Sequence, residues 1–101
     1  MGMRWPYPSP PRLGVGLPSD SVEAETVFDK RVKALFPTGL VEAELIRELR
    51  SQGFRLDREG ADCKSATKLR GLLIKTLWSV RWRAHEGRVD DVWGVFGYRA
   101  I

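Results

Sequence analysis

Apolar and polar residues alternate along the last quarter of the chain, from Leu77 to Tyr98. The alternation covers two arms, and the segment His85-Glu86-Gly87 between them has the composition of a tight turn. Three of the four tryptophans lie on these arms. The pattern predicts a long β-hairpin with one face buried beneath the rest of the protein and the other face exposed to solvent.

Two registers of this hairpin fit the sequence. A three-residue loop pairs Arg81 with Asp91 and leaves Trp93 exposed, whereas a two-residue loop pairs Arg83 with Asp90 and turns Trp93 toward the core. We favour the first register because it keeps both aspartates away from the centre of the core. The predicted buried face is then made of Ile74, Trp78, Val80, Trp82, Val92, Phe96 and Tyr98. The predicted exposed face is made of Lys75, Leu77, Arg81, Arg83, Val89, Trp93 and Val95.

Apolar spacings of three and four residues predict a helix from about Ser21 to Phe36. Asp20 precedes it as an N-cap, and Pro37 terminates it. Its apolar stripe is Ala24, Val27, Phe28, Val32, Leu35 and Phe36. We expect the opposite face, with Glu25, Asp29, Lys30 and Lys33, to be solvated.

A second helix is predicted after Thr38-Gly39. Gly53 occupies the position of a left-handed C′ residue, and Phe54 can pack back onto Leu49 as in a Schellman ending. The predicted core face consists of Val41, Leu45, Ile46 and Leu49. The predicted solvent face consists of Glu42, Glu44, Arg47, Glu48 and Arg50.

The sequence predicts an α+β fold: two helices followed by an antiparallel sheet of three or four strands, with the helices on one face of the sheet. A strand is expected from Phe54 to Arg58. Residues 59–73 are less informative, and we favour a short strand or an extended loop there because Gly71 argues against a helix. Residues 1–18 are rich in proline and glycine and are predicted to be an extended tail, so that residues 19–101 form a single domain.

The net charge of +4 is unevenly distributed. Residues 1–63 hold nine Lys and Arg against ten Asp and Glu, whereas residues 64–101 hold eight against three. The basic half is therefore the half with the aromatic hairpin, which permits an anionic partner. We expect a cytoplasmic protein, because the amino-terminal residues have no apolar stretch typical of a secretory signal and a single cysteine cannot form an intramolecular disulfide.

Several short segments occur in the order Phe36-Pro-Thr-Gly39, Gly53-Phe54, Trp78-Ser-Val-Arg-Trp82, Gly87-Arg88-Val89 and Gly94-Val-Phe-Gly97. This layout resembles that of small bacterial proteins of uncharacterised role. In element order, over about residues 20–101, it is also similar to the outer-membrane assembly lipoprotein E (small protein A) family, whose domain is a helical pair followed by a three-stranded sheet. The lipid-carrying cysteine of that family has no counterpart near the start of this sequence, since Cys63 is far inside. No functional residue is carried over from the resemblance.

Nucleophilic catalysis requires a base within hydrogen-bond reach of the nucleophile. The chain has one cysteine, Cys63, and one histidine, His85, and we interpret them as a small apolar residue and a solvated turn residue. Metal-ligand spacing is missing, and Gly14-Val-Gly16 lacks the lysine and helix of a phosphate-binding loop. We therefore predict no catalytic residue, no metal site and no cofactor, and we do not expect an enzyme.

The exposed hairpin face is the candidate binding surface. Arginine and tryptophan are common anchors of protein interfaces, and basic side chains beside an aromatic ring also suit phosphate contact with base stacking. The candidate binding residues are Lys75, Arg81, Arg83, Arg88 and Trp93.

We predict a small non-enzymatic binding or adaptor protein of bacterial or phage type. Its partner is expected to be another protein, or a second copy of the chain, held through the hairpin face or the edge of the last strand. The alternative is a nucleic-acid-associated protein that uses the same basic and aromatic face, and a third reading is an envelope factor similar to the lipoproteins named above. No membrane partner and no small-molecule substrate are expected.

Overall fold

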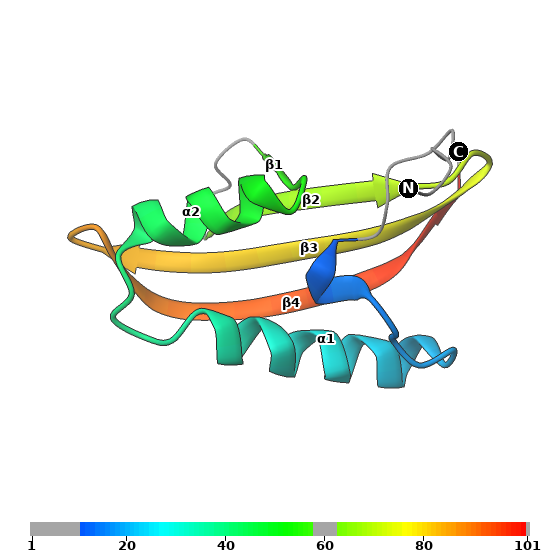
Figure 1. Cartoon of the computed structure of the whole chain (residues 1–101), viewed down its shortest axis with the longest axis horizontal. Coiled ribbons are helices and arrows are strands. Elements are labelled where there is room, and N and C mark those ends of the chain that lie inside the picture. The colour runs from blue at the N-terminus through cyan, green and yellow to red at the C-terminus, as the bar shows by residue number, and fades with distance from the viewer. Residues whose placement is uncertain (1–10, 58–62, 101) are drawn as a thin grey trace, which may run out of the picture.

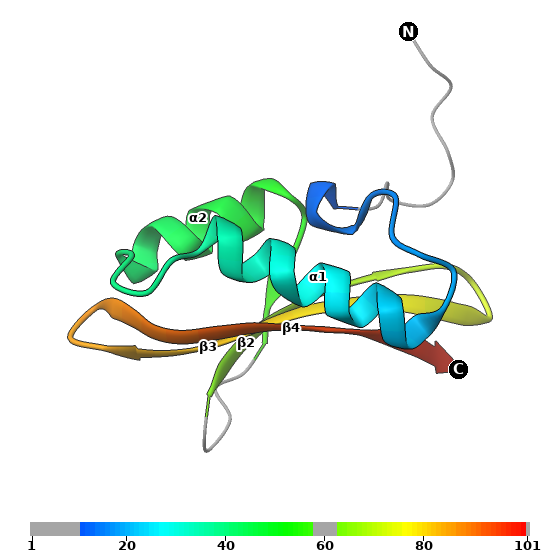
Figure 2. The same cartoon turned by 90° about the horizontal axis from the view of Figure 1, so that it is seen from below.

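The structure is a computed structural model that describes residues 11–57 and 63–100 of the chain. Two helices precede a four-stranded antiparallel sheet, so the predicted α+β class is confirmed. Both helices lie on one face of the sheet, as predicted (Figure 2). The elements are the 3-10 turn η1 (Arg12–Gly14), the helices α1 (Ser21–Leu35) and α2 (Glu42–Ser51), and the strands β1 (Arg55–Leu56), β2 (Lys64–Arg70), β3 (Ile74–His85) and β4 (Arg88–Ala100).

The strands follow one another in the order β1-β2-β3-β4, and each pairs with its neighbour in the chain (Figure 1). Strand β2 lies in the segment for which a strand or an extended loop was predicted. Strand β1 is shorter than the expected strand from Phe54 to Arg58, whose last residue lies outside the described part of the chain. The two long strands, β3 and β4, hold five of the six described core residues that belong to the sheet, so they position both of its faces.

The ends of both helices form as their sequences predict. The Asp20 side chain accepts hydrogen bonds from the backbone N–H groups of Val22 and Glu23, so it caps α1. At the end of α2, Gly53 has a φ of 87°, and the Phe54 N–H donates to the carbonyl of Leu49 at 3.0 Å. This is the Schellman geometry, which satisfies carbonyl groups that the helix leaves unpaired.

The hairpin has the two-residue turn of the alternative register, but beyond the turn its pairing differs from both predicted registers. Glu86 and Gly87 form a two-residue turn with φ values of 52° and 76°, as a type I′ turn requires. A bulge then leaves Asp90 without a partner on β3, and beyond it Arg83 pairs with Asp91. The extra residue keeps Trp93 on the exposed face, as in the favoured register, although the favoured pairing of Arg81 with Asp91 is wrong.

The core is built on the face of β3 that was predicted to be buried. Trp78, Val80 and Trp82 are at most 4% exposed, and they belong to one core cluster with buried residues of α1 and α2. Two members of the predicted buried face, Ile74 and Tyr98, are instead exposed, at the end of the β3–β4 hairpin farthest from its turn.

The predicted exposed face also needs a correction at one residue. Val89 is 1% exposed because the bulge turns it inward. Its N–H and carbonyl then bond to Leu40 and Gly39 in the loop between the helices. This loop thus holds the turn end of the hairpin against the helical layer.

Helix α1 lies along the outer edge of β4 (Figure 1). The Asp29 carboxylate accepts a hydrogen bond from the Gly94 N–H at 2.9 Å, and Glu25 accepts one from the Phe96 N–H at 3.1 Å. These carboxylates were expected to face solvent, but they satisfy backbone donors that an edge strand otherwise leaves open. Edge pairing with another chain is therefore hindered along the middle of β4.

Part of the segment expected to be an extended tail is packed onto the domain. In η1, Leu13 is 7% exposed, and Arg31 donates hydrogen bonds to the carbonyls of Leu13 and Val15. Gly14 lies against the ring of Trp78, where a Cβ atom would be 2.3 Å from Nε1. This strap, residues 11–15, adds to the cover over the core; residues 1–10 lie outside the described residues.

Replacing Gly14 with alanine is expected to release the strap. The added methyl group overlaps the buried indole of Trp78, and overpacking of this kind costs about 1–3 kcal/mol. The strap is not paired with any strand of the sheet, so we expect faster tryptic cleavage after Arg12 and a modest fall in melting temperature. The matched variant is Val15→Ala, which changes an exposed side chain and should leave both measurements unchanged. Equal cleavage of the two variants would contradict the contact.

Candidate functional site

The uncovered side of the sheet is the candidate site. Because side chains alternate along a strand, the residues between the buried positions of β3 point to this side. We call it the open face. Its residues are Arg55, Asp57, Ser65, Thr67, Leu69, Lys75, Leu77, Ser79, Arg81, Arg83, Asp91, Trp93, Val95, Gly97 and Arg99.

Two cations are paired directly at one end of the open face. Lys75 on β3 is the cross-strand partner of Arg99 on β4. Neither side chain forms an ion pair with any residue that the structure describes. Like charges directly opposite each other destabilise a sheet, so this pair needs an explanation other than stability.

The other end of the open face combines cations with an aromatic ring. Arg81 is the cross-strand partner of Trp93, and the Arg83 guanidinium lies 5.1 Å from the centroid of the Trp93 ring. Arg83 also lies 3.4 Å from a carboxylate oxygen of Asp91. Arg83 is thus held over the indole by a cation–π contact and an ion pair.

Between these ends the open face is apolar and hydroxylic. Leu77 lies between Leu69 and Gly97, and the next row along the sheet contains Thr67, Ser79 and Val95. Beside them, an open hollow of about 880 Å³ extends to the β1 edge, where Arg55 and Asp57 line it. The Asp57 carboxylate accepts hydrogen bonds from Ser65 and Thr67, which leaves it engaged within the sheet.

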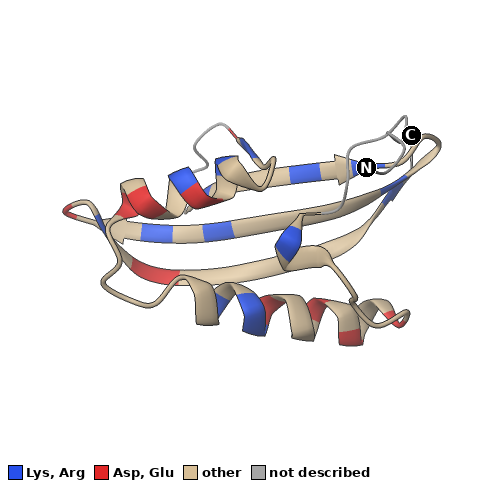
Figure 3. Cartoon of the chain, viewed as in Figure 1, with Lys and Arg blue, Asp and Glu red and all other residues tan. Residues whose placement is uncertain are grey.

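The structure brings four of the five candidate residues to one face. Lys75, Arg81, Arg83 and Trp93 all belong to the open face (the cations of β3 are blue in Figure 3). Arg88 lies apart, because the bulge and the turn direct its guanidinium to the Gly39 carbonyl, 2.9 Å away in the loop between the helices. The open face also contains Arg99 and Arg55, which the sequence analysis did not include. Continuing the alternation beyond Tyr98 would have placed Arg99 on this face, but no pattern in the neighbouring sequence indicated Arg55.

Two ionisable groups with shifted pKa values lie on the helix-covered face. Burial raises the pKa of Glu42, but hydrogen bonds from Trp82 and Lys64 and the Lys64 charge outweigh it, so the pKa is lowered overall. Burial lowers the pKa of Lys68, whose ammonium donates to the Gln52 carbonyl at 3.2 Å. Both groups serve contacts between α2 and the sheet, and we assign neither to the site.

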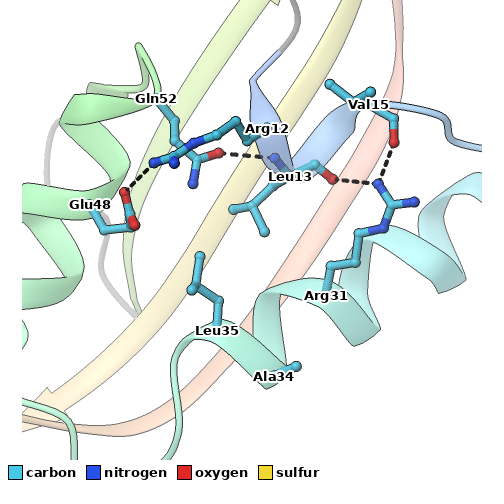
Figure 4. A pocket seen from close by; sticks show the side chains of 8 residues that line it. All are labelled: Arg12, Leu13, Val15, Arg31, Ala34, Leu35, Glu48 and Gln52. Atoms are coloured by element: carbon cyan, nitrogen blue, oxygen red, sulfur yellow. Dashed lines mark hydrogen bonds and ion pairs between the residues drawn. The ribbon is translucent and has the colours of Figure 1, made fainter.

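A second hollow, of about 700 Å³, lies between η1 and the two helices (Figure 4). Its polar groups bond to one another: Gln52 accepts from the Leu13 N–H, and Arg12 contacts Glu48 at 3.1 Å. Arg31 is engaged with two strap carbonyls. Since these groups hold the strap, this hollow is better explained as part of the fold than as a ligand site.

The described residues contain no cluster of His, Cys, Asp and Glu able to hold a metal ion. Within the same part of the chain, no hydrogen bond joins Cys63 to His85, whose Nε2 lies 3.7 Å from a Glu86 oxygen. Neither described helix has the length and apolarity needed to cross a bilayer.

The open face is therefore a charged and partly apolar surface with two basic ends. Comparison of the chain with family models, with curated proteins and with solved structures gave no match. The resemblance in element order to the lipoprotein family stays a prediction from the sequence.

Proposed function

We propose that this protein is a non-enzymatic binding module whose open face holds an acidic segment of a protein partner. The observation that carries the proposal is the cross-strand pair of Lys75 and Arg99, which has no anionic partner in the described chain. A carboxylate from a partner would offset the repulsion between the two cations.

The spacing along β3 supports an extended segment. Lys75 and Arg81 are six residues apart on one strand, which corresponds to roughly 20 Å. Leu77 and Val95 lie between these basic ends and can contact apolar side chains of the partner. The complementary segment therefore carries acidic residues at both ends and apolar residues between them.

The same geometry favours a protein over a nucleic acid. Single-stranded nucleic acids stack successive bases on aromatic side chains. The open face has one aromatic residue, Trp93, and Arg83 already lies over it. The middle of the face is apolar and hydroxylic, which does not match a continuous row of phosphates.

A designed peptide tests the proposal. The probe is a labelled seven-residue strand with glutamate at both ends and valine at alternate positions, and its control has the same composition with both glutamates at one end. We expect Lys75→Gln/Arg99→Gln to weaken binding of the probe about tenfold. The control variant Arg47→Gln/Arg50→Gln makes the same charge change on exposed positions of α2 and should have little effect.

Stability gives an independent readout on the same variants. Removing two facing cations should raise the melting temperature of Lys75→Gln/Arg99→Gln by about 2–4 °C, since a cross-strand pair is worth roughly 0.5 kcal/mol. Tighter binding to an oligonucleotide of similar length than to the peptide would refute the proposal and favour the nucleic-acid alternative. Failure to bind the probe at low salt would also refute it.

A further inference from the structure

Three consecutive apolar residues form the turn end between β2 and β3. Leu72, Leu73 and Ile74 are 62%, 76% and 65% exposed. We call these three residues the apolar tip. Leu72 and Leu73 lie in the turn itself and Ile74 begins β3, so all three apolar side chains are left exposed at this end of the sheet. The tip lies beyond the ends of the helices, at one end of the long axis (Figures 1 and 2).

The apolar tip is a tight projection. Gly71, which precedes it, has a φ of 126°, and a Cβ atom there would be 2.4 Å from the carbonyl oxygen of Ile74. Only glycine fits this compact turn, whose backbone holds the leucines away from the sheet. A projecting apolar turn has the shape to enter a lipid phase or a deep pocket of another molecule. It does not itself form a cavity that could hold a ligand.

Cations surround the base of the apolar tip. Lys75 and Arg99 are paired one residue behind it, and Arg70 ends the adjoining strand. The sequence has no Asp or Glu from residue 64 to residue 85, or after residue 91. The acidic residues of α1 lie on the helix-covered side of the sheet, along β4, toward the same end of the molecule as the tip (Figure 3).

An aromatic residue lies just behind these cations. Tyr98 is 58% exposed, and its ring meets Phe96 edge-on with centroids 5.6 Å apart. An exposed tyrosine next to apolar residues and cations is typical of the region where a protein meets lipid headgroups. Tyr98 pairs with Thr76, so it lies two residue pairs behind the tip, next to the pair of Lys75 and Arg99.

We propose that the apolar tip inserts into the surface of an anionic lipid bilayer, with Lys75 and Arg99 on the headgroups. Apolar insertion and attraction to anionic lipid reinforce each other in peripheral binding. A second copy of the chain is a poorer partner for the tip. The three side chains expose roughly 300 Å² of surface, whereas a stable protein interface buries about 800 Å² per partner. The proposal goes beyond the proposed function and reverses the expectation of no membrane partner.

Vesicle binding and a reporter dye at the tip test the insertion. We expect the wild-type protein to co-sediment with phosphatidylcholine vesicles that contain about one third phosphatidylserine, and less with phosphatidylcholine alone. Leu72→Ser/Leu73→Ser should lower the partition coefficient at least tenfold, whereas Leu56→Ser, at another exposed leucine, should not. An environment-sensitive dye on Leu73→Cys, in a Cys63→Ser background, should shift to the blue, and the same dye on Glu44→Cys should not.

The outcomes separate this inference from the proposed function. Arg81→Gln should weaken binding of the acidic peptide and leave vesicle binding unchanged. Leu72→Ser/Leu73→Ser should weaken vesicle binding and leave binding of the acidic peptide unchanged. Insertion is refuted if the wild-type protein stays in the supernatant at low salt, or if the emission of the dye at position 73 does not shift when vesicles are added. A tip-dependent dimer without vesicle binding would also refute it.

Discussion

Replacing Gly94 with alanine is expected to destabilise the protein by about 3 kcal/mol. Gly94 faces α1 from the middle of β4, and a Cβ atom there would be 2.7 Å from Phe28 and 3.1 Å from Val32. Both neighbours are fully buried, so they have no free space into which to move. Moving the strand instead would break the hydrogen bond from the Gly94 N–H to Asp29.

Thermal unfolding measures this effect, and Gly97→Ala is its matched control. Gly97 is on the same strand but on the open face, where a Cβ atom meets nothing within 4 Å. We expect Gly94→Ala to lower the melting temperature by about 10–20 °C, and Gly97→Ala to leave it unchanged or raise it slightly. Similar changes in the two variants would contradict the close packing of α1 on β4.

The opposite effects expected at Gly94 and Gly97 depend on which face of the hairpin is buried, and the sequence predicts that face correctly. Alternation places Trp78, Val80 and Trp82 together because side chains of a strand alternate in direction whatever the pairing. The register was not predictable in the same way. It depends on the bulge at Asp90, which is stabilised by bonds between Val89 and the loop joining the helices.

The candidate site was predictable to the same extent. Lys75, Arg81, Arg83 and Trp93 share a face because they belong to the alternation, whereas Arg88 lies beyond the bulge and turns away. The apolar tip was not singled out by its sequence, since Leu72, Leu73 and Ile74 are equally compatible with a buried strand. Their exposure follows from where the helices end, which is a tertiary property.

The helical pattern is wrong at Leu35 and Val41, which are exposed although predicted to be in the core, and at several carboxylates. Glu25 and Asp29 on α1, and Glu42 on α2, all lie on faces predicted to be solvated. In the structure each accepts hydrogen bonds from the sheet. Periodicity separates apolar from polar positions, but it does not reveal buried donors on another element that need an acceptor.

Glu42 provides the clearest of these contacts. Its carboxylate accepts a hydrogen bond from Trp82 Nε1 at 2.7 Å, and the Lys64 ammonium lies 2.9 Å from the same oxygen. Trp82 is 1% exposed, so loss of the acceptor leaves a buried N–H group unpaired. We expect Glu42→Ala to lower the free energy of unfolding by about 2–3 kcal/mol at neutral pH. Glu44→Ala, at an exposed position two residues further along α2, should lower it by less than about 0.5 kcal/mol.

The variant Glu42→Gln isolates the charge of this carboxylate. Because the pKa of Glu42 is lower in the folded protein than its ordinary value of 4.5, its charge stabilises the fold above that value, and the contribution is lost as the pH falls through the lower, folded pKa. Urea unfolding should therefore show wild type more stable than Glu42→Gln by about 1 kcal/mol at neutral pH, with the difference shrinking in acid. A difference that stays constant from neutral pH to well below 4.5 would show that the Glu42 charge makes no contribution to folding.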